Sequence, residues 1–233
     1  MMKLHRVAPW LALLLLVLLG GEFAVGSIER LLGVHGYSDL TPQALVAIAG
    51  ARSIAELCLA LFGVYAILQA PLTSIGLRLP GIGGLAFGVA IGLVTALIFP
   101  QLVHDLRLES SYTLQYEMYI TFRATGLIAI ASLLVFPVLS PIVEEIIFRG
   151  IVVEGLVNVT NGVVAIVVSA IIFAAIHVGG GAAQIAVTFI SGLLYGWLYL
   201  RTRSIVPSSV AHIIYNAVAF YPLILYVLRA KHF

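Results

Sequence analysis

The stretch GLIAIASLLVFPVLSPIVEEIIFR, from Gly126 to Arg149, decides what kind of fold this sequence can adopt. It contains no charged residue until Glu144, and a helix needs roughly 20 mostly apolar residues to cross the hydrocarbon layer of a bilayer. Lipid offers the backbone no hydrogen-bond partners, so only helices and closed barrels span it. The run is continuously apolar and lacks the alternation of a barrel strand. It therefore predicts a membrane helix that carries ionisable groups.

The composition of the whole chain agrees with this prediction. Of its 233 residues, 62% are hydrophobic and 9% are charged, whereas soluble domains carry about 25% charged residues. A net charge of +2 gives no reason to expect nucleic acid as a partner. We expect an all-α, polytopic transmembrane helical bundle.

Apolar runs place about seven spans along the chain, or eight if the polar segment 101–123 hides another. Pro137 and Pro141 should kink or break the fourth span. Basic residues divide evenly between the two sides, so the orientation stays open. The seven expected spans cover approximately residues 9–28, 43–69, 82–100, 126–149, 163–177, 182–200 and 206–228.

The N-terminus fits two interpretations. Lys3, His5 and Arg6 precede the apolar run Leu11 to Leu19, which is also the pattern of a signal peptide. We favour a retained first helix, because polytopic membrane proteins often begin in this way.

Two glutamates and an arginine follow the apolar part of the fourth span. An ionisable group inside a span costs about 2.5 to 3.5 kcal/mol on insertion scales, so each one demands a reason. Glu145 and Arg149 are four residues apart and can form an ion pair within the helix. Glu144 points about 100° away, which leaves its carboxylate free for another task.

Three further polar side chains lie in the later spans. His212 and Asn216 are four residues apart and present two hydrogen-bonding groups on one helix face. Phe173 precedes His177 by one turn and could shield that histidine from water. Together with the glutamate pair, these residues predict one polar site inside the membrane.

Three short motifs order these residues: E-E-x-x-x-R at 144–149, F-x-x-x-H at 173–177 and H-x-x-x-N at 212–216. In this order, the sequence resembles the CPBP family of intramembrane proteases, which includes CAAX prenyl endopeptidases and bacteriocin-processing or self-immunity proteins. The resemblance extends from about residue 126 to residue 221. It implies two parts, with N-terminal transmembrane helices and a polar connecting segment at 1–123, and a CPBP-type catalytic helical core at 124–233.

The resemblance also implies a role for each motif residue. Glu144 is expected to be the general base that activates water, with His177 sharing that water. His212 and Asn216 are expected to donate hydrogen bonds to the oxyanion, while Glu145 and Arg149 hold the shape of the site. No cofactor is implied. The implied substrate is a membrane-associated or lipidated protein or peptide, and the expected location is a prokaryotic cell membrane.

Other functions would use the same residues differently. A zinc-dependent intramembrane protease could take His177, His212 and Glu144 as ligands and leave the fourth position to water. The chain has no H-E-x-x-H motif, and a site with so few carboxylates would lack support for those ligands. A non-proteolytic scaffold or immunity protein could keep the motifs and bind a partner helix. A proton-coupled transporter is disfavoured, because the polar residues occupy only one half of the chain.

The remaining polar residues are expected to be structural. Arg52 and Glu56 are four residues apart in the second span and should form an ion pair. Gly179 to Gly181 should form a tight loop, since no strand precedes them as a phosphate-binding loop would require. Four histidines should be solvated: His5, His35, His104 and His232.

Overall fold

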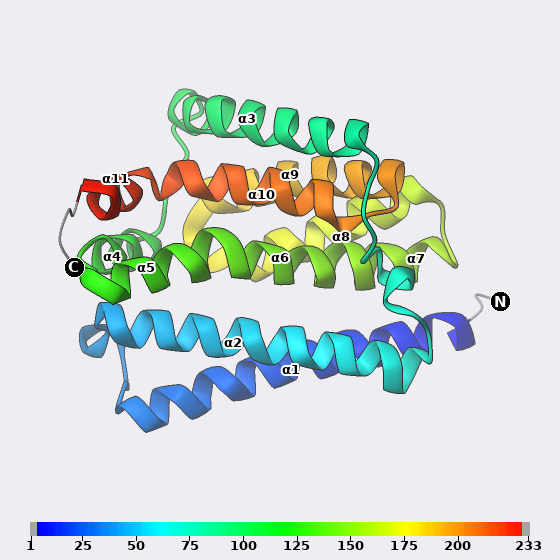
Figure 1. The fold of residues 1–233 in the computed structure, drawn as a ribbon, viewed down its shortest axis with the longest axis horizontal. Coiled ribbons are helices and arrows are strands. Elements are labelled where there is room, and N and C mark those ends of the chain that lie inside the picture. Colours follow the sequence, from blue (N-terminus) through cyan, green and yellow to red (C-terminus); the bar gives the residue numbers. More distant parts are fainter. Residues whose placement is uncertain (1–3, 230–233) are drawn as a thin grey trace.

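A computed structural model describes residues 4–229, so Lys3 and His232 lie outside the described part of the chain. Every regular element within residues 4–229 is a helix. The model confirms the expected all-α polytopic bundle, whose helices run roughly along one common direction in Figure 1.

The first two long helices form a hairpin along one side of the bundle (Figure 1). They are α1 (Leu4–Leu32) and α2 (Pro42–Gly63), and a π-helical turn, Val64–Leu68, extends α2. The Thr41 side chain accepts a hydrogen bond from the backbone N–H of Ala44, and a proline occupies the first turn. This N-cap starts α2 next to the beginning of the span expected at about 43–69.

Helix α3 (Ile82–Asp105) lies on the opposite side of the bundle and packs against α10 (Ile205–Ala219) (Figure 1). Glycine allows this close approach. A methyl group at Gly92 would lie 2.9 Å from the carbonyl oxygen of Ala211, which is too close for any larger residue.

The central span is one continuous helical segment of 32 residues, Gly126–Val157. The two prolines do not break it, and the helical register changes where they lie. Pro137 lies in a π-helical turn, and Pro141 lies in the first turn of the next α-helix. The segment consists of α5 (Gly126–Leu134), the π turn Val135–Leu139, α6 (Ser140–Glu145), the π turn Ile146–Val153 and α7 (Glu154–Val157).

The C-terminal helices are α8 (Gly162–Ile176), α9 (Gly181–Thr202), α10 and α11 (Tyr221–Arg229). Helix α8 packs against α9. The last span was expected at about residues 206–228, and there the structure has two helices, α10 and α11, with a bend of 72° between them at Phe220.

The expected seven or eight spans are not all found. Within residues 4–229, five helices are long and apolar enough to cross a membrane, or six if the bent pair is one span. Helix α8, which corresponds to the span expected at 163–177, has 15 residues. It is therefore about 22 Å long, whereas the hydrocarbon layer is about 30 Å thick. The polar segment 101–123 holds the end of α3 and α4 (Tyr112–Phe122), whose 11 residues are too few for an eighth.

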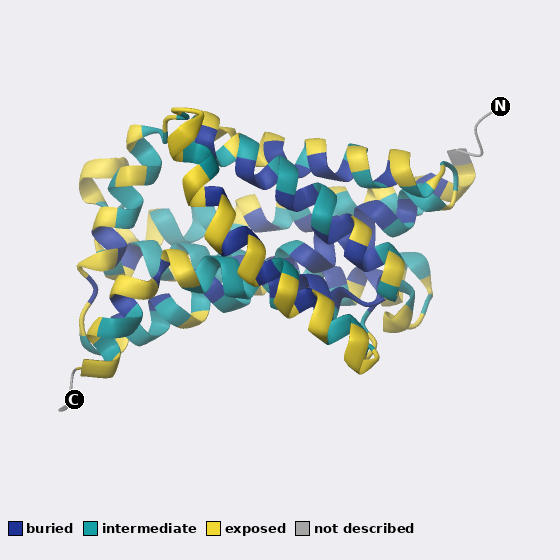
Figure 2. Cartoon of the chain, turned by 90° about the horizontal axis from the view of Figure 1, so that it is seen from above, coloured by how far each residue is buried: buried dark blue, intermediate teal, exposed yellow. Residues whose placement is uncertain are grey.

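Buried residues concentrate where the helices face one another, and exposed residues follow the outer faces (Figure 2). The π turn Ile146–Val153 is fully buried and contacts Leu13 and Val17 of α1 in one apolar core. Large apolar side chains such as Leu19 and Leu97 face outward, as expected for a surface in contact with lipid.

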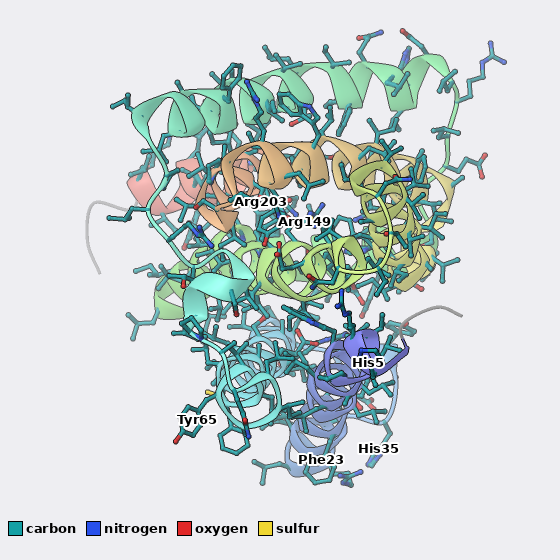
Figure 3. The ribbon with its side chains drawn as sticks, turned by 90° about the vertical axis from the view of Figure 1, so that its right-hand side faces the viewer. His5, Phe23, His35, Tyr65, Arg149 and Arg203 are labelled. Atoms are coloured by element: carbon teal, nitrogen blue, oxygen red, sulfur yellow. The ribbon has the colours of Figure 1, made fainter. Side chains whose placement is uncertain are left out.

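Three histidines outside the candidate site lie at the surface of the described part of the chain. Figure 3 shows Arg149 in the middle of the bundle, with His5 and His35 on the α1–α2 side. His5, His35 and His104 are exposed, as expected for solvated side chains.

Candidate active site

Glu145 and Arg149 form the expected ion pair in the middle of the bundle. Glu145 Oε1 lies 3.0 Å from Arg149 Nη1, and both side chains are buried. The N–H bonds of the guanidinium are not aligned with any acceptor in residues 4–229. Instead, its central carbon lies 4.9 Å from the ring centre of Phe173 and 5.3 Å from that of Tyr195. Two aromatic faces therefore share the cation with Glu145.

His177 lies at the end of α8, where its ring is held in one orientation. Its Nδ1 is 2.8 Å from the carbonyl oxygen of Phe173, and its ring packs edge-on against the Phe173 ring. A carbonyl oxygen only accepts hydrogen bonds, so Nδ1 carries the hydrogen. In the neutral ring, Nε2 is therefore free to accept a proton.

His212 lies between the two glutamates. Its Nδ1 is 3.2 Å from Glu145 Oε1, within hydrogen-bond distance, and its Nε2 is 3.7 Å from Glu144 Oε2. The His212 side chain is buried, whereas about a quarter of the Glu144 side chain is exposed. The contact with Glu145 was not expected from the sequence, and it gives the buried glutamate a second partner besides Arg149.

Asn216 is held by a carbonyl group that the helix itself leaves without a partner. The N–H of Ser140 bonds to the carbonyl oxygen of Val135, in the five-residue register of a π turn. Pro141 has no N–H to continue this register to Phe136. The Nδ2 atom of Asn216 donates to that Phe136 carbonyl over 3.3 Å. A proline of the fourth span thus helps to position a polar side chain of the last one.

The structure brings the four expected catalytic residues to one small cavity of about 70 Å³. This volume can hold water molecules but not a peptide. A second cavity of about 940 Å³ is lined by three of the same residues and has room for a peptide segment. The lining of the small cavity includes Glu144, His177, His212 and Asn216.

Several residues around these cavities were missed or judged to be structural from the sequence. Arg52 and Glu56 form the expected pair at 3.0 Å, and Glu22 adds a second carboxylate 2.9 Å from Arg52. Arg52 and Glu56 also line the larger cavity, so their place in the molecule is beside the candidate site. The one sequence feature that indicated a place near the site was the charge of these two residues inside a span. Gln184 and Tyr195 stand among apolar residues of α9, and no motif identified them.

The expected alternative of a zinc site requires three ligands that converge. Within residues 4–229, no three His, Cys, Asp or Glu side chains are arranged to hold a metal ion. The arrangement around His212 suits hydrogen bonding to carboxylates.

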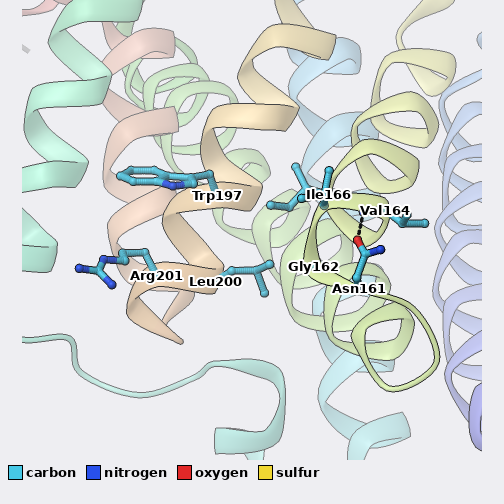
Figure 4. A pocket seen from close by; sticks show the side chains of 8 residues that line it. Asn161, Gly162, Val164, Ile166, Trp197, Leu200 and Arg201 are labelled. Carbon is cyan, nitrogen blue, oxygen red and sulfur yellow. Dashed lines mark hydrogen bonds between the residues drawn. The ribbon is translucent and has the colours of Figure 1, made fainter.

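A separate hollow lies between α8 and α9 and contains none of the candidate residues (Figure 4). It has a volume of about 630 Å³, and its walls include Asn161, Trp197 and Leu200. The candidate chemistry is therefore confined to the cavities beside Glu144.

The fold and these contacts define a helical membrane protein with a glutamate and histidine site in its C-terminal half. Residues 126–218 match the family model described as type II CAAX prenyl endopeptidase Rce1-like. The match confirms the resemblance of this segment to CPBP intramembrane proteases. No curated protein and no solved structure matches the chain.

Proposed function

We propose that this protein hydrolyses a peptide bond within the membrane by means of a water molecule that Glu144 activates. The match of residues 126–218 supports a CAAX-type endopeptidase in the membrane. The observation that supports the residue roles is the shared cavity, which collects all four expected catalytic residues from three separate helical segments. Of the two adjacent glutamates, Glu145 is paired with Arg149 and Glu144 is not.

In the proposed reaction, Glu144 takes a proton from water as the water oxygen attacks the carbonyl carbon of the scissile bond. His177 shares this water through Nε2, which is left free because Nδ1 is bonded to Phe173. The carbonyl π electrons move to oxygen, and His212 and Asn216 donate hydrogen bonds to the resulting oxyanion. The intermediate then breaks its C–N bond, and Glu144 returns the proton to the leaving amine.

The role proposed for His212 sets a condition on its protonation. A carboxylate accepts but does not donate, so the contact with Glu145 requires a hydrogen on Nδ1. Donation to the oxyanion from Nε2 then requires a second hydrogen, and hence a doubly protonated ring.

The proposed substrate is a membrane-associated or lipidated peptide, and the proposed location is a prokaryotic cell membrane. The larger cavity supports a peptide substrate by its volume, and the family supports a protein substrate in a membrane environment. We also propose the division of the chain into an N-terminal part, 1–123, and a catalytic core, 124–233. The proposed mechanism uses only side chains and no cofactor.

Comparing the wild type with Glu144→Gln tests this function. Both proteins are reconstituted in liposomes with a library of lipid-anchored peptides, and new peptide termini are identified by mass spectrometry. We expect cleavage by the wild type and none by the variant, with equal yields of folded protein. Cleavage that persists in Glu144→Gln would remove Glu144 from its role. A wild type that binds peptides without cleaving them would favour the scaffold alternative.

A further inference from the structure

The larger cavity is shared by the family domain and by helices outside it. Its lining includes Glu144, His177 and Asn216 together with residues of α2 and α4. The α2 and α4 residues precede residue 126, where the family match begins. The N-terminal part of the chain therefore completes the space in which a peptide would meet Glu144.

Helix α4 is held against the candidate site at its first turn. The N–H of Ser111, the N-cap of α4, donates to the carbonyl oxygen of Gly180 over 2.9 Å. The N–H of Ala183 donates to the carbonyl oxygen of Glu109 over 3.1 Å. Gly181 allows this contact, because it has a φ of +86° and a methyl group there would lie 2.7 Å from the Ser111 nitrogen. The glycine loop after His177 thus fixes where α4 lies.

Of the arginine and the glutamates that line this cavity, all but one lie within ion-pair distance of a side chain of the other type. Arg52 is paired with Glu56, and Glu144 faces His212. Glu117 of α4 also lines the cavity, and no ion pair reaches its carboxylate within residues 4–229. Burial raises the pKa of Glu117, and no neighbouring cation offsets this effect.

We propose that Glu117 is a specificity-determining residue that binds a lysine or arginine side chain of the peptide substrate. A half-buried carboxylate without a partner is strongly stabilised by a cation that enters the same cavity. Because α4 is fixed next to His177, this cation lies at a set distance along the peptide from the scissile bond. The inference rests on the proposed function, since it names the peptide that the endopeptidase selects.

The test uses a protein that binds without cleaving. Glu144→Gln is placed in nanodiscs of zwitterionic lipid with lipid-anchored decapeptides that differ only by Lys, Gln or Glu at one scanned position. We expect the Lys peptide to be enriched about three- to tenfold over the Gln peptide at one position, as measured by mass spectrometry of the bound fraction. Adding Glu117→Gln should remove this preference, and adding Glu117→Lys should shift it toward the Glu peptide.

Glu109→Gln is the matched control, because Glu109 is exposed at the same end of the molecule and does not line the cavity. It should keep the Lys preference. If Glu117→Gln folds poorly, Glu117→Asp keeps the charge and should keep the preference. An equal affinity for Lys and Gln peptides, or a Lys preference that survives Glu117→Gln, would overturn the inference. A Lys preference in a wild type that never cleaves would instead contradict the proposed function alone.

Discussion

At the scale of single residues, the paired glutamates have different surroundings although they are adjacent in sequence. Glu145 is fully buried and contacts Arg149 and His212, whereas Glu144 is partly exposed to the cavities. Their positions on the helix predicted this division, because the four-residue spacing links only Glu145 to Arg149. The contact with His212 could not be predicted, since it joins residues 67 positions apart.

Arg149→Ala should lower the yield and stability of the folded protein. It leaves Glu145 buried without its cation, and breaking a buried ion pair costs about 3 to 5 kcal/mol. Thermal unfolding in detergent would measure the loss, with Glu144→Gln as the comparison that should unfold near the wild-type temperature. An equal loss of stability in both variants would show that the two glutamates do not have separate roles.

At the scale of elements, the sequence predicted where the helices lie better than how they end or bend. Long apolar runs predicted the positions of the early helices, because burial in lipid leaves a local pattern in the sequence. The bend at Phe220 and the π-helical turn at Pro137 depend on packing between distant segments. The apolar run expected at 163–177 agrees with the length of α8, but its 15 residues, between the N-cap at Asn161 and the end at His177, are too few for the membrane span expected there.

Pro141→Ala should stabilise the central span and lower the activity of the protein. The new N–H can bond within the helix, where it competes with Asn216 for the Phe136 carbonyl. Asn216 then loses the contact that orients it, and we expect kcat to fall about 10²-fold, the low end for a lost oxyanion donor, with little change in KM. Steady-state kinetics together with thermal unfolding would measure both effects. An unchanged kcat would show that this hydrogen bond does not position Asn216.

At the scale of the whole molecule, the motifs predicted only one half of the space around Glu144. No sequence motif lies in α4, so nothing connected this helix with the site before the structure. The structure places α4 and the Arg52–Glu56 pair at the larger cavity. Such neighbours come from the arrangement of helices, which spacing within one helix does not determine.

Proteolysis should survive exhaustive chelation, and the purified protein should contain no stoichiometric zinc. The proposed mechanism uses one carboxylate base and hydrogen-bond donors, and it asks no side chain to bind a metal. Peptide cleavage before and after dialysis against a chelator, together with elemental analysis, would check this prediction. Activity lost on chelation and restored only by zinc would replace the mechanism while leaving the fold as described.

The short helix α8 has a consequence for the surrounding lipid. At about 22 Å it is roughly 8 Å shorter than the hydrocarbon layer, and it ends at the residue expected to share the reactive water. Lipid next to such a helix thins to avoid the mismatch, which draws headgroups and water toward His177. Longer acyl chains oppose this thinning, so cleavage should slow as the bilayer thickens. Rates in liposomes of increasing chain length would reveal this dependence, which makes membrane thickness a control on the supply of water.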